Sequence, residues 1–195
     1  PAKYGFTPET FMAMFVPNTY EMYWTATPED FTDRMAREYE KFWKSRDKKL
    51  RRLGMTREEV STLASIVDEE TLLDEENERV AGVYMNRIQK GMPLQACPTL
   101  KFAMGDFTIT RILHEYKRVE SPYNTYKYRG LPPGPIIIPS VSAIDAVLNY
   151  EDHNYLYMAA KADFSGRHAF ARNLAQHNRN AAEYQKELDR RKIYR

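Results

Sequence analysis

Hydrophobic positions in the first quarter of the chain recur at the spacing of an α-helix. Residues 27–29, Thr-Pro-Glu, have the pattern of a helix start, with Thr at the cap and Pro in the first turn. The apolar side chains that follow at helical spacing are Phe31, Met35, Tyr39 and Phe42. Residues 7–9 repeat the same start, and residues 19–25 have the aromatic and β-branched content of a strand. The pattern therefore predicts a helix, a strand and a long helix in residues 1–54.

A charged stretch, residues 44–52, follows the long helix and is closed by Gly54. We interpret it as a solvated helix end and turn, and the alternative is a basic patch for an anionic polymer. In either case it is the best candidate for a boundary. We therefore expect an N-terminal subdomain, residues 1–54, packed on a main domain, residues 55–195.

The main domain is predicted to consist of helices and two short strands. A capping box, Thr56 to Glu59, opens a helix that runs to about Thr71. The next helix spans about residues 75–90 and stops at Gly91, in the position of a C-cap. The other predicted elements are a helix at 140–148, strands at 154–160 and 168–170, and a polar helix from about residue 173 onward.

Residues 92–135 lie between these elements and are dense in turn formers, including Pro93, Pro98, Gly105, Pro122 and the run Leu-Pro-Pro-Gly-Pro at 131–135. A long irregular segment inside a compact domain is usually functional. The predicted fold class is therefore α+β: a helix-rich domain with short strands and a long irregular segment that forms a substrate cleft.

Composition narrows the function classes. The 29 basic and 27 acidic residues give a net charge of +2 without a basic block, which argues against nucleic acid as a partner. One cysteine, Cys97, excludes an intrachain disulfide and a cysteine-based zinc site. The four histidines have no close metal-ligand spacing, so we expect no metal and no cofactor. The 14 Tyr and 9 Phe residues serve either core packing or stacking on sugar faces.

The chain has no apolar run near the ~20 residues that span a bilayer. The longest runs are a few residues, such as 136–138, and residue one is Pro. We therefore expect a trimmed fragment of a longer protein.

Glu70 stands out when the helix at residues 57–71 is drawn at 100° per residue. The side chains on its apolar face are Val60, Leu63, Ala64, Val67 and Thr71, and Glu70 falls on that same face. Asp68 lies toward the rim, and Glu69 points away. A carboxylate on a core-facing stripe is costly when charged, and a raised pKa is a common resolution at general acids. The alternative is a helix that ends near Val67, with Glu70 exposed in the following turn.

Several separated motifs resemble the YceG-like family. Two of them are helical: LASIVDEET at 63–71 and VAGVYMNR at 80–87. The others, in chain order, are GMPLQ at 91–95, PT at 98–99, YNTY at 123–126, GLPPGPI at 130–136, Pro139, YLY at 155–157, HAF at 168–170 and HN at 177–178. The resemblance spans roughly residue 15 to the C-terminus. The first motif also resembles that of spore cortex-lytic enzymes, in which the catalytic Glu aligns with Glu70.

The resemblance implies an endolytic lytic transglycosylase, a lyase that cuts the MurNAc–GlcNAc β-1,4 bond within peptidoglycan strands and helps to terminate nascent strands. Glu70 would donate a proton to the leaving oxygen and then accept one from the muramic 6-hydroxyl. A 1,6-anhydro ring would result, without a partner carboxylate. Expected sugar contacts are Gln95, Asn124 and Tyr126, although Asn124 could instead hold its own turn and Tyr126 could pack. His177 is expected to fix the last helix against the loops.

Two positions depart from the family pattern, in which many relatives have Glu at Asp68 and Asp at or beside Cys97. The resemblance also implies glycan strands as partner, together with peptidoglycan synthases, and a membrane anchor and a LysM-like region upstream. We thus expect a catalytic part outside the cytoplasm, anchored to the inner membrane. Three alternatives stay open: a muramidase-type hydrolase, a non-catalytic peptidoglycan-binding or scaffolding module, and an enzyme that also recruits partners.

Overall fold

The computed structural model describes residues 1–109 and 115–193. Its α-helices in these ranges are α1 (Pro28–Lys44), α2 (Asp47–Leu53), α3 (Arg57–Glu70), α4 (Asp74–Gln89), α5 (Cys97–Met104), α6 (Val141–Leu148) and α7 (Leu174–Arg190). Short 3-10 helices are η1 (Ala2–Tyr4), η2 (Phe11–Met14) and η3 (Tyr116–Arg118). Strands β1 (Tyr157–Ala160) and β2 (His168–Ala171) pair antiparallel, with Tyr157 opposite Ala171. The predicted α+β class, rich in helices, is confirmed.

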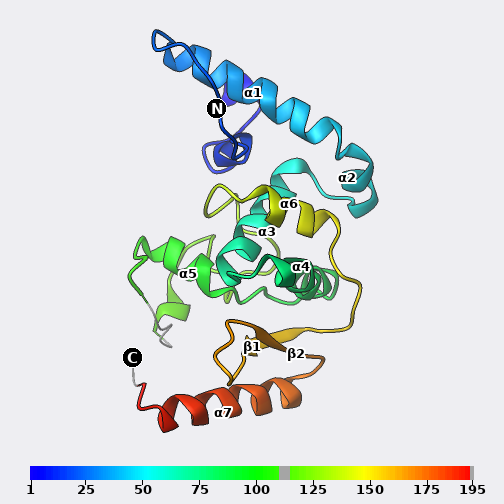
Figure 1. Ribbon diagram of the computed structural model, residues 1–195, viewed down its shortest axis with the longest axis vertical. Coiled ribbons are helices and arrows are strands. Elements are labelled where there is room, and N and C mark those ends of the chain that lie inside the picture. The colour runs from blue at the N-terminus through cyan, green and yellow to red at the C-terminus, as the bar shows by residue number, and fades with distance from the viewer. Residues whose placement is uncertain (110–114, 194–195) are drawn as a thin grey trace.

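Helix α3 is the centre of the fold and packs against α4, α5 and α6 (Figure 1). The Thr56–Glu59 capping box starts it as predicted. Every residue from Val60 to Val67 is buried, so α3 is enclosed on all sides rather than along one stripe. A small polar residue of α3 bonds to a segment that encloses the helix. Ser65 Oγ accepts a hydrogen bond of 3.0 Å from the backbone N–H of Ile136. The irregular segment is thereby fastened to the central helix.

Helix α5 lies in the stretch where turn formers predicted irregular structure. Pro98 occupies its first turn, where a missing N–H costs nothing, and Gly105 ends it in a left-handed conformation. The same residues that suggested a loop therefore delimit a helix of eight residues.

Two predictions for the N-terminal region were wrong. Residues 19–25 form no strand, and the described part of the chain places no neighbouring strand beside them; Tyr23 and Trp24 are almost fully exposed. Aromatic and β-branched residues favour a strand only where their side chains pack against a neighbouring strand, and the described residues provide none here. The start at residues 7–9 leads to η2 instead of an α-helix, because Thr7 and Thr10 bond to each other in a turn.

The long helix predicted after residue 27 is confirmed as α1, with a capping box between Thr27 and Asp30. Its inner face joins the rest of the fold through Tyr39, whose hydroxyl donates to Glu58 at 2.7 Å. A second link between the N-terminal region and the rest of the fold is the ion pair of Arg46, which follows α1, with Asp145 in α6. Gly134 adds a third, since a Cβ there would overlap the carbonyl oxygen of Glu9. The division into a subdomain 1–54 and a domain 55–195 stays a prediction.

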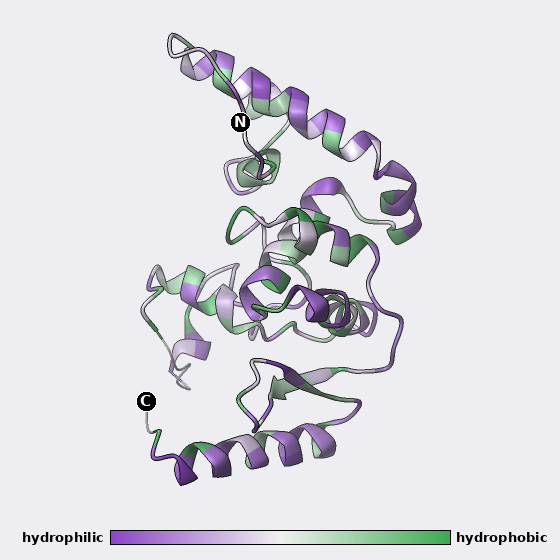
Figure 2. Cartoon of the chain, viewed as in Figure 1, coloured by the Kyte–Doolittle hydropathy of each residue, from purple (hydrophilic) through white to green (hydrophobic). Residues whose placement is uncertain are grey.

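The β1–β2 hairpin and α7 form the opposite end of the molecule from α1 (Figure 1). The polar helix predicted from about residue 173 is confirmed as α7, which is capped by Asn173 and packs against β1. Both terminal helices are mainly hydrophilic along their length (Figure 2). No helix within the described ranges has the length and apolar character needed to cross a membrane.

Candidate active site

Glu70 is the last residue of α3, and its carboxyl lines a cavity of about 540 Å³. Thr71 then turns the chain into an extended conformation, and α4 packs back along α3. This return brings the buried Tyr84 to Glu70, and its hydroxyl donates to Oε2 at 3.2 Å. The cavity is lined by Glu70, Val83, Tyr84, Arg87, Leu94, Gln95, Cys97, Lys117, Tyr126, Tyr157, Met158, Leu174 and His177. The alternative of an exposed Glu70 beyond the helix end is therefore wrong.

Burial raises the pKa of Glu70 above its ordinary value. The electrostatic interaction with His168, the Tyr84 hydrogen bond and the Arg87 charge lower the pKa of Glu70 without reversing the shift. A carboxyl in low dielectric prefers its neutral form, because the charged form loses its hydration. Glu70 is therefore suited to hold a proton and give it to a substrate oxygen.

The neighbouring acids lie in different environments, as the helical wheel predicted. Asp68 is half-buried and accepts two hydrogen bonds from Ser140, at 2.7 Å from the backbone N–H and at 2.9 Å from Oγ. It thus fixes the start of α6. Glu69 is exposed. Among the residues that line the described cavity, Glu70 supplies the carboxyl group.

Gln95 lies at the edge of the cavity in a left-handed backbone conformation, with φ of 54°. Its backbone N–H donates to the Thr125 carbonyl at 3.0 Å, which fixes this strained residue. Its side chain is exposed, and Oε1 accepts a long bond of 3.4 Å from Arg87. The amide N–H₂ of Gln95 is thus placed where a ligand in the cavity could meet it.

Tyr126 and Cys97 form one wall of the cavity. The Tyr126 hydroxyl and Cys97 Sγ are 3.3 Å apart, and burial raises the pKa of both groups. Both therefore stay protonated near neutral pH. The Lys117 ammonium lies 5.0 Å from the centre of the Tyr126 ring.

Asn124 does not lie with the other expected sugar contacts. It is fully buried, and Nδ2 donates to the carbonyl oxygens of Lys117 and Val119 at 3.0 and 2.9 Å. Its Oδ1 accepts from the Tyr126 backbone N–H at 3.0 Å. The geometry assigns this amide to the turn, the alternative that the sequence left open, and through it to the placement of Lys117 and Tyr126.

The sequence analysis did not single out Tyr84, Arg87, Lys117 or Tyr157 as cavity residues. Tyr84 and Arg87 belong to the motif at 80–87, so their spacing was a usable signal: three residues place both on one face of α4. Lys117 carried no such signal, because only the turn around Asn124 brings it to the cavity.

His177, which was expected to fix the last helix against the loops, lines the cavity from α7. Its ring stacks on Tyr157 at 5.3 Å, and burial lowers its pKa. Its Nδ1 atom is buried and has no hydrogen-bond partner within the described residues. A neutral imidazole here can serve as a donor or acceptor to a ligand.

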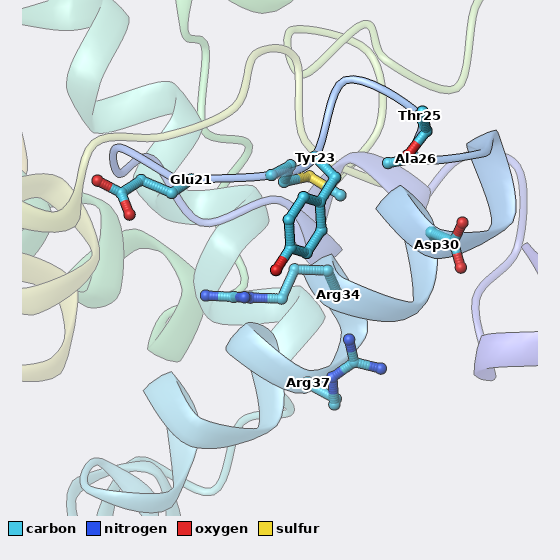
Figure 3. Close-up of a pocket in the computed structure, with 8 residues that line it drawn as sticks. Glu21, Tyr23, Thr25, Ala26, Asp30, Arg34 and Arg37 are labelled. Carbon is cyan, nitrogen blue, oxygen red and sulfur yellow. The ribbon is translucent and has the colours of Figure 1, made fainter.

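The described ranges contain no group of three or more His, Cys, Asp or Glu side chains placed to hold a metal ion. A second cavity, of about 660 Å³, lies between residues 21–26 and α1 (Figure 3). Its labelled side chains carry both acidic and basic groups, with Asp30 already in the α1 cap. The carboxyl group whose pKa is raised by burial therefore belongs to the Glu70 cavity.

Comparison with known proteins yields a consistent set of relatives. The sequence profile of the YceG-like family matches residues 2–183. The endolytic murein transglycosylase of Bacillus subtilis (strain 168) is 32% identical over 156 residues, 80% of this chain and 42% of that protein. The protein of the same name from Streptococcus pneumoniae serotype 2 (strain D39) is 31% identical over 172 residues, 86% of this chain and 31% of that protein.

Among solved structures, the crystal structure of a yceG-like protein from Listeria monocytogenes is similar, with a TM-score of 0.75 and 31% identity. The match covers 86% of this chain and 54% of that one. The chain thus spans less than half the length of the two curated relatives that it matches.

Proposed function

The chain belongs to the YceG-like family, and we propose that it carries the catalytic centre of an endolytic lytic transglycosylase that acts on peptidoglycan. Both curated relatives described above are named endolytic murein transglycosylases. The bond cut is the β-1,4 linkage between MurNAc and GlcNAc within a glycan strand.

In the proposed mechanism the Glu70 carboxyl donates its proton to the glycosidic oxygen as the bond from MurNAc C1 to that oxygen breaks. The resulting carboxylate then accepts the proton of the MurNAc 6-hydroxyl. That oxygen bonds to C1 and closes a 1,6-anhydro ring. The two proton transfers balance, so Glu70 ends in its starting form and water is not consumed.

The observation that carries the proposal is a single carboxyl group in the cavity, whose pKa is raised by burial, with the neighbouring acids directed elsewhere. Hydrolytic glycosidases use two carboxyl groups, about 5–5.5 Å apart in retaining enzymes and about 6.5–9.5 Å apart in inverting ones. Here Asp68 is bonded to Ser140 and Glu69 faces solvent. A mechanism that needs a single acid–base group fits this arrangement better than a muramidase-type hydrolysis.

The other cavity residues have roles in binding. We assign Gln95 to a hydrogen bond with an N-acetyl or hydroxyl group, and the Tyr126 ring to one face of a sugar. Asn124 acts indirectly, by fixing the turn that presents Tyr126 and Lys117. Tyr84 supports the Glu70 carboxylate in the second half of the reaction.

The products test the proposal. Purified peptidoglycan digested with the chain should release strands with 1,6-anhydro-MurNAc ends, lighter by one water than reducing ends. Digestion in H₂¹⁸O should leave the new ends unlabelled in a mass spectrum. Labelled reducing ends would assign the chain to the hydrolases instead.

We also propose that the native protein works at the inner membrane with its catalytic part in the periplasm or extracytoplasmic space, next to peptidoglycan synthases. The proposed substrate supports this placement, because peptidoglycan and its nascent strands occur on that side of the membrane. Fractionation of cells that express the full-length protein tests the placement, and cross-linking at the cell envelope tests the partners. Recovery in the cytoplasmic fraction would reject the placement.

A further inference from the structure

The charged groups that line the Glu70 cavity are unequal in sign. They are one acid, Glu70, and two cations, Arg87 and Lys117. Two cations against one acid leave these lining groups with an excess of positive charge whether Glu70 is neutral or ionised. The bonding partners of Arg87 and Lys117 show that neighbouring acids do not neutralise this positive charge.

Arg87 is buried, and its hydrogen-bond partners among the described residues are neutral oxygens. It donates to the backbone carbonyls of Leu156, Pro93 and Leu94 at 2.7, 3.1 and 2.7 Å, and to Gln95 Oε1 at 3.4 Å. No carboxylate within the described ranges lies within ion-pair distance of it. A guanidinium in such a site is usually paired with an anion, because an uncompensated buried charge is costly.

Lys117 is half-buried and is held in place through its backbone, whose carbonyl accepts from Asn124. Its ammonium lies over the Tyr126 ring, and the described residues offer it no ion pair. Lys127, ten residues along the same segment, forms an ion pair with Glu120 and lies outside the cavity. The contrast marks Lys117 as the cation that this segment leaves open toward the cavity.

We propose that Lys117, supported by Arg87, forms an anion subsite that binds a carboxylate of the glycan strand next to the bond that is cut. This inference rests on the proposed function, since the strand is its ligand. Two carboxylates have this chemistry: the lactyl group of a muramic residue without a peptide, and the carboxylates of a stem peptide. Either is ionised near neutral pH. The subsite would distinguish muramic residues from uncharged sugars of the same size.

A different role for the same cations is to stabilise the Glu70 carboxylate during the reaction. That role would act on turnover with every substrate. An anion subsite acts on binding, and only with substrates that carry the carboxylate. Measurements of binding without turnover therefore separate the two.

The experiment uses the Glu70→Gln variant, which cannot transfer the proton, and fluorescent glycan strands of uniform length. Three forms of strand are compared: peptide-bearing, amidase-stripped with free lactyl carboxylates, and stripped strands whose lactyl groups are converted to carboxamides. Binding is measured by anisotropy, with Lys117→Gln added to the same background. Arg118→Gln is the matched control, because it removes an equal charge from the adjacent, exposed position outside the cavity.

The inference predicts that the carboxamide strand binds about tenfold more weakly than the preferred carboxylate strand, the effect of losing one charge-assisted bond. Lys117→Gln should abolish that difference, and Arg118→Gln should preserve it. Tight binding of stripped strands identifies the lactyl group, and tight binding of peptide-bearing strands alone identifies the stem peptide. Equal affinity for all three forms would overturn the inference.

Failure of the proposed function is seen separately, as the absence of 1,6-anhydro ends when the unmodified chain digests any of these strands. Thermal melts of each variant identify misfolding. Lys117 is half-buried and makes its loop contact through the backbone, so its substitution should leave the melting temperature within a few degrees. Arg87 is unsuitable for this test, since its side chain supports four oxygen acceptors.

Discussion

The hydroxyl of Tyr84 donates a 3.2 Å hydrogen bond to Oε2 of Glu70, from the helix that follows α3 in the chain. The bond joins two groups whose pKa values are both raised by burial. It opposes the shift of Glu70, because a donor stabilises the carboxylate. Burial therefore favours the neutral form of Glu70, and the Tyr84 hydrogen bond supports its ionised form during a reaction.

Replacing Tyr84 by Phe removes this donor. The pKa of Glu70 should then rise further, so the pH at which activity declines through loss of the acid proton should move upward. Turnover should fall about three- to tenfold, since the anion formed in the reaction loses a bond worth about 1 kcal/mol. A pH–rate profile of the purified variant measures both effects. Tyr39→Phe is the control, because it removes an equally buried hydroxyl bonded to Glu58, away from the cavity.

Replacing Glu70 by Gln should lower turnover by at least about 100-fold, the lower end of general acid–base contributions. It should not lower the thermal midpoint near neutral pH, because an amide avoids the cost of burying a carboxylate. A folded variant with near-normal turnover would falsify the central claim, and an unfolded one would make Glu70 structural.

The same variant has a predicted pH dependence of stability. The pKa of Glu70 is raised on folding, so its neutral form favours the folded state at low pH. That contribution is present below the unfolded-state pKa and is lost as pH rises toward the folded-state pKa. The melting temperature of Glu70→Gln should therefore rise relative to that of the unmodified protein as the pH increases above about 4, the ordinary pKa of a Glu side chain. Glu69→Gln, at an exposed position, should show no such trend.

Replacing Asp68 by Asn should reduce stability by about 1 kcal/mol, a typical value for a weakened hydrogen bond, and should retain most of the activity. The reason is that Asp68 bonds to Ser140 at the start of α6 and performs no proton transfer. Denaturant titration measures the loss. Ser140→Ala should cost a similar amount, and the double variant should cost less than the sum. Additive losses would contradict the pairing.

Replacing Cys97 by Ser should be close to neutral for activity, because its thiol contacts the Tyr126 hydroxyl and takes no part in the proton transfers. Burial raises the pKa of this thiol, so its thiolate fraction near pH 7 is below that of a free cysteine. Alkylation should be correspondingly slow in the folded protein and fast in denaturant. A Ser variant with strongly reduced turnover would count against the first expectation, and rapid alkylation of the folded protein would count against the second.

The sequence determined the local features. Caps at Thr27, Thr56, Ser140 and Asn173 are helix starts in the structure, since a cap involves only neighbouring residues. The inward direction of Glu70 followed from the period of one helix. The strand predicted at residues 19–25 was wrong because a strand needs a neighbouring strand, which a local sequence pattern does not specify.

Tertiary structure decided which side chains meet at Glu70. Tyr84 contacts Glu70 because α4 packs back along α3. Lys117 lies at the cavity because the buried amide of Asn124 donates to its backbone carbonyl and fixes the turn. The sequence placed Asn124 with the sugar contacts, since a polar side chain in a loop looks the same whether it faces a ligand or its own backbone. Only the packing of α3, α4 and the irregular segment distinguishes these cases, because it alone sets which polar atoms lose contact with water and must bond to one another.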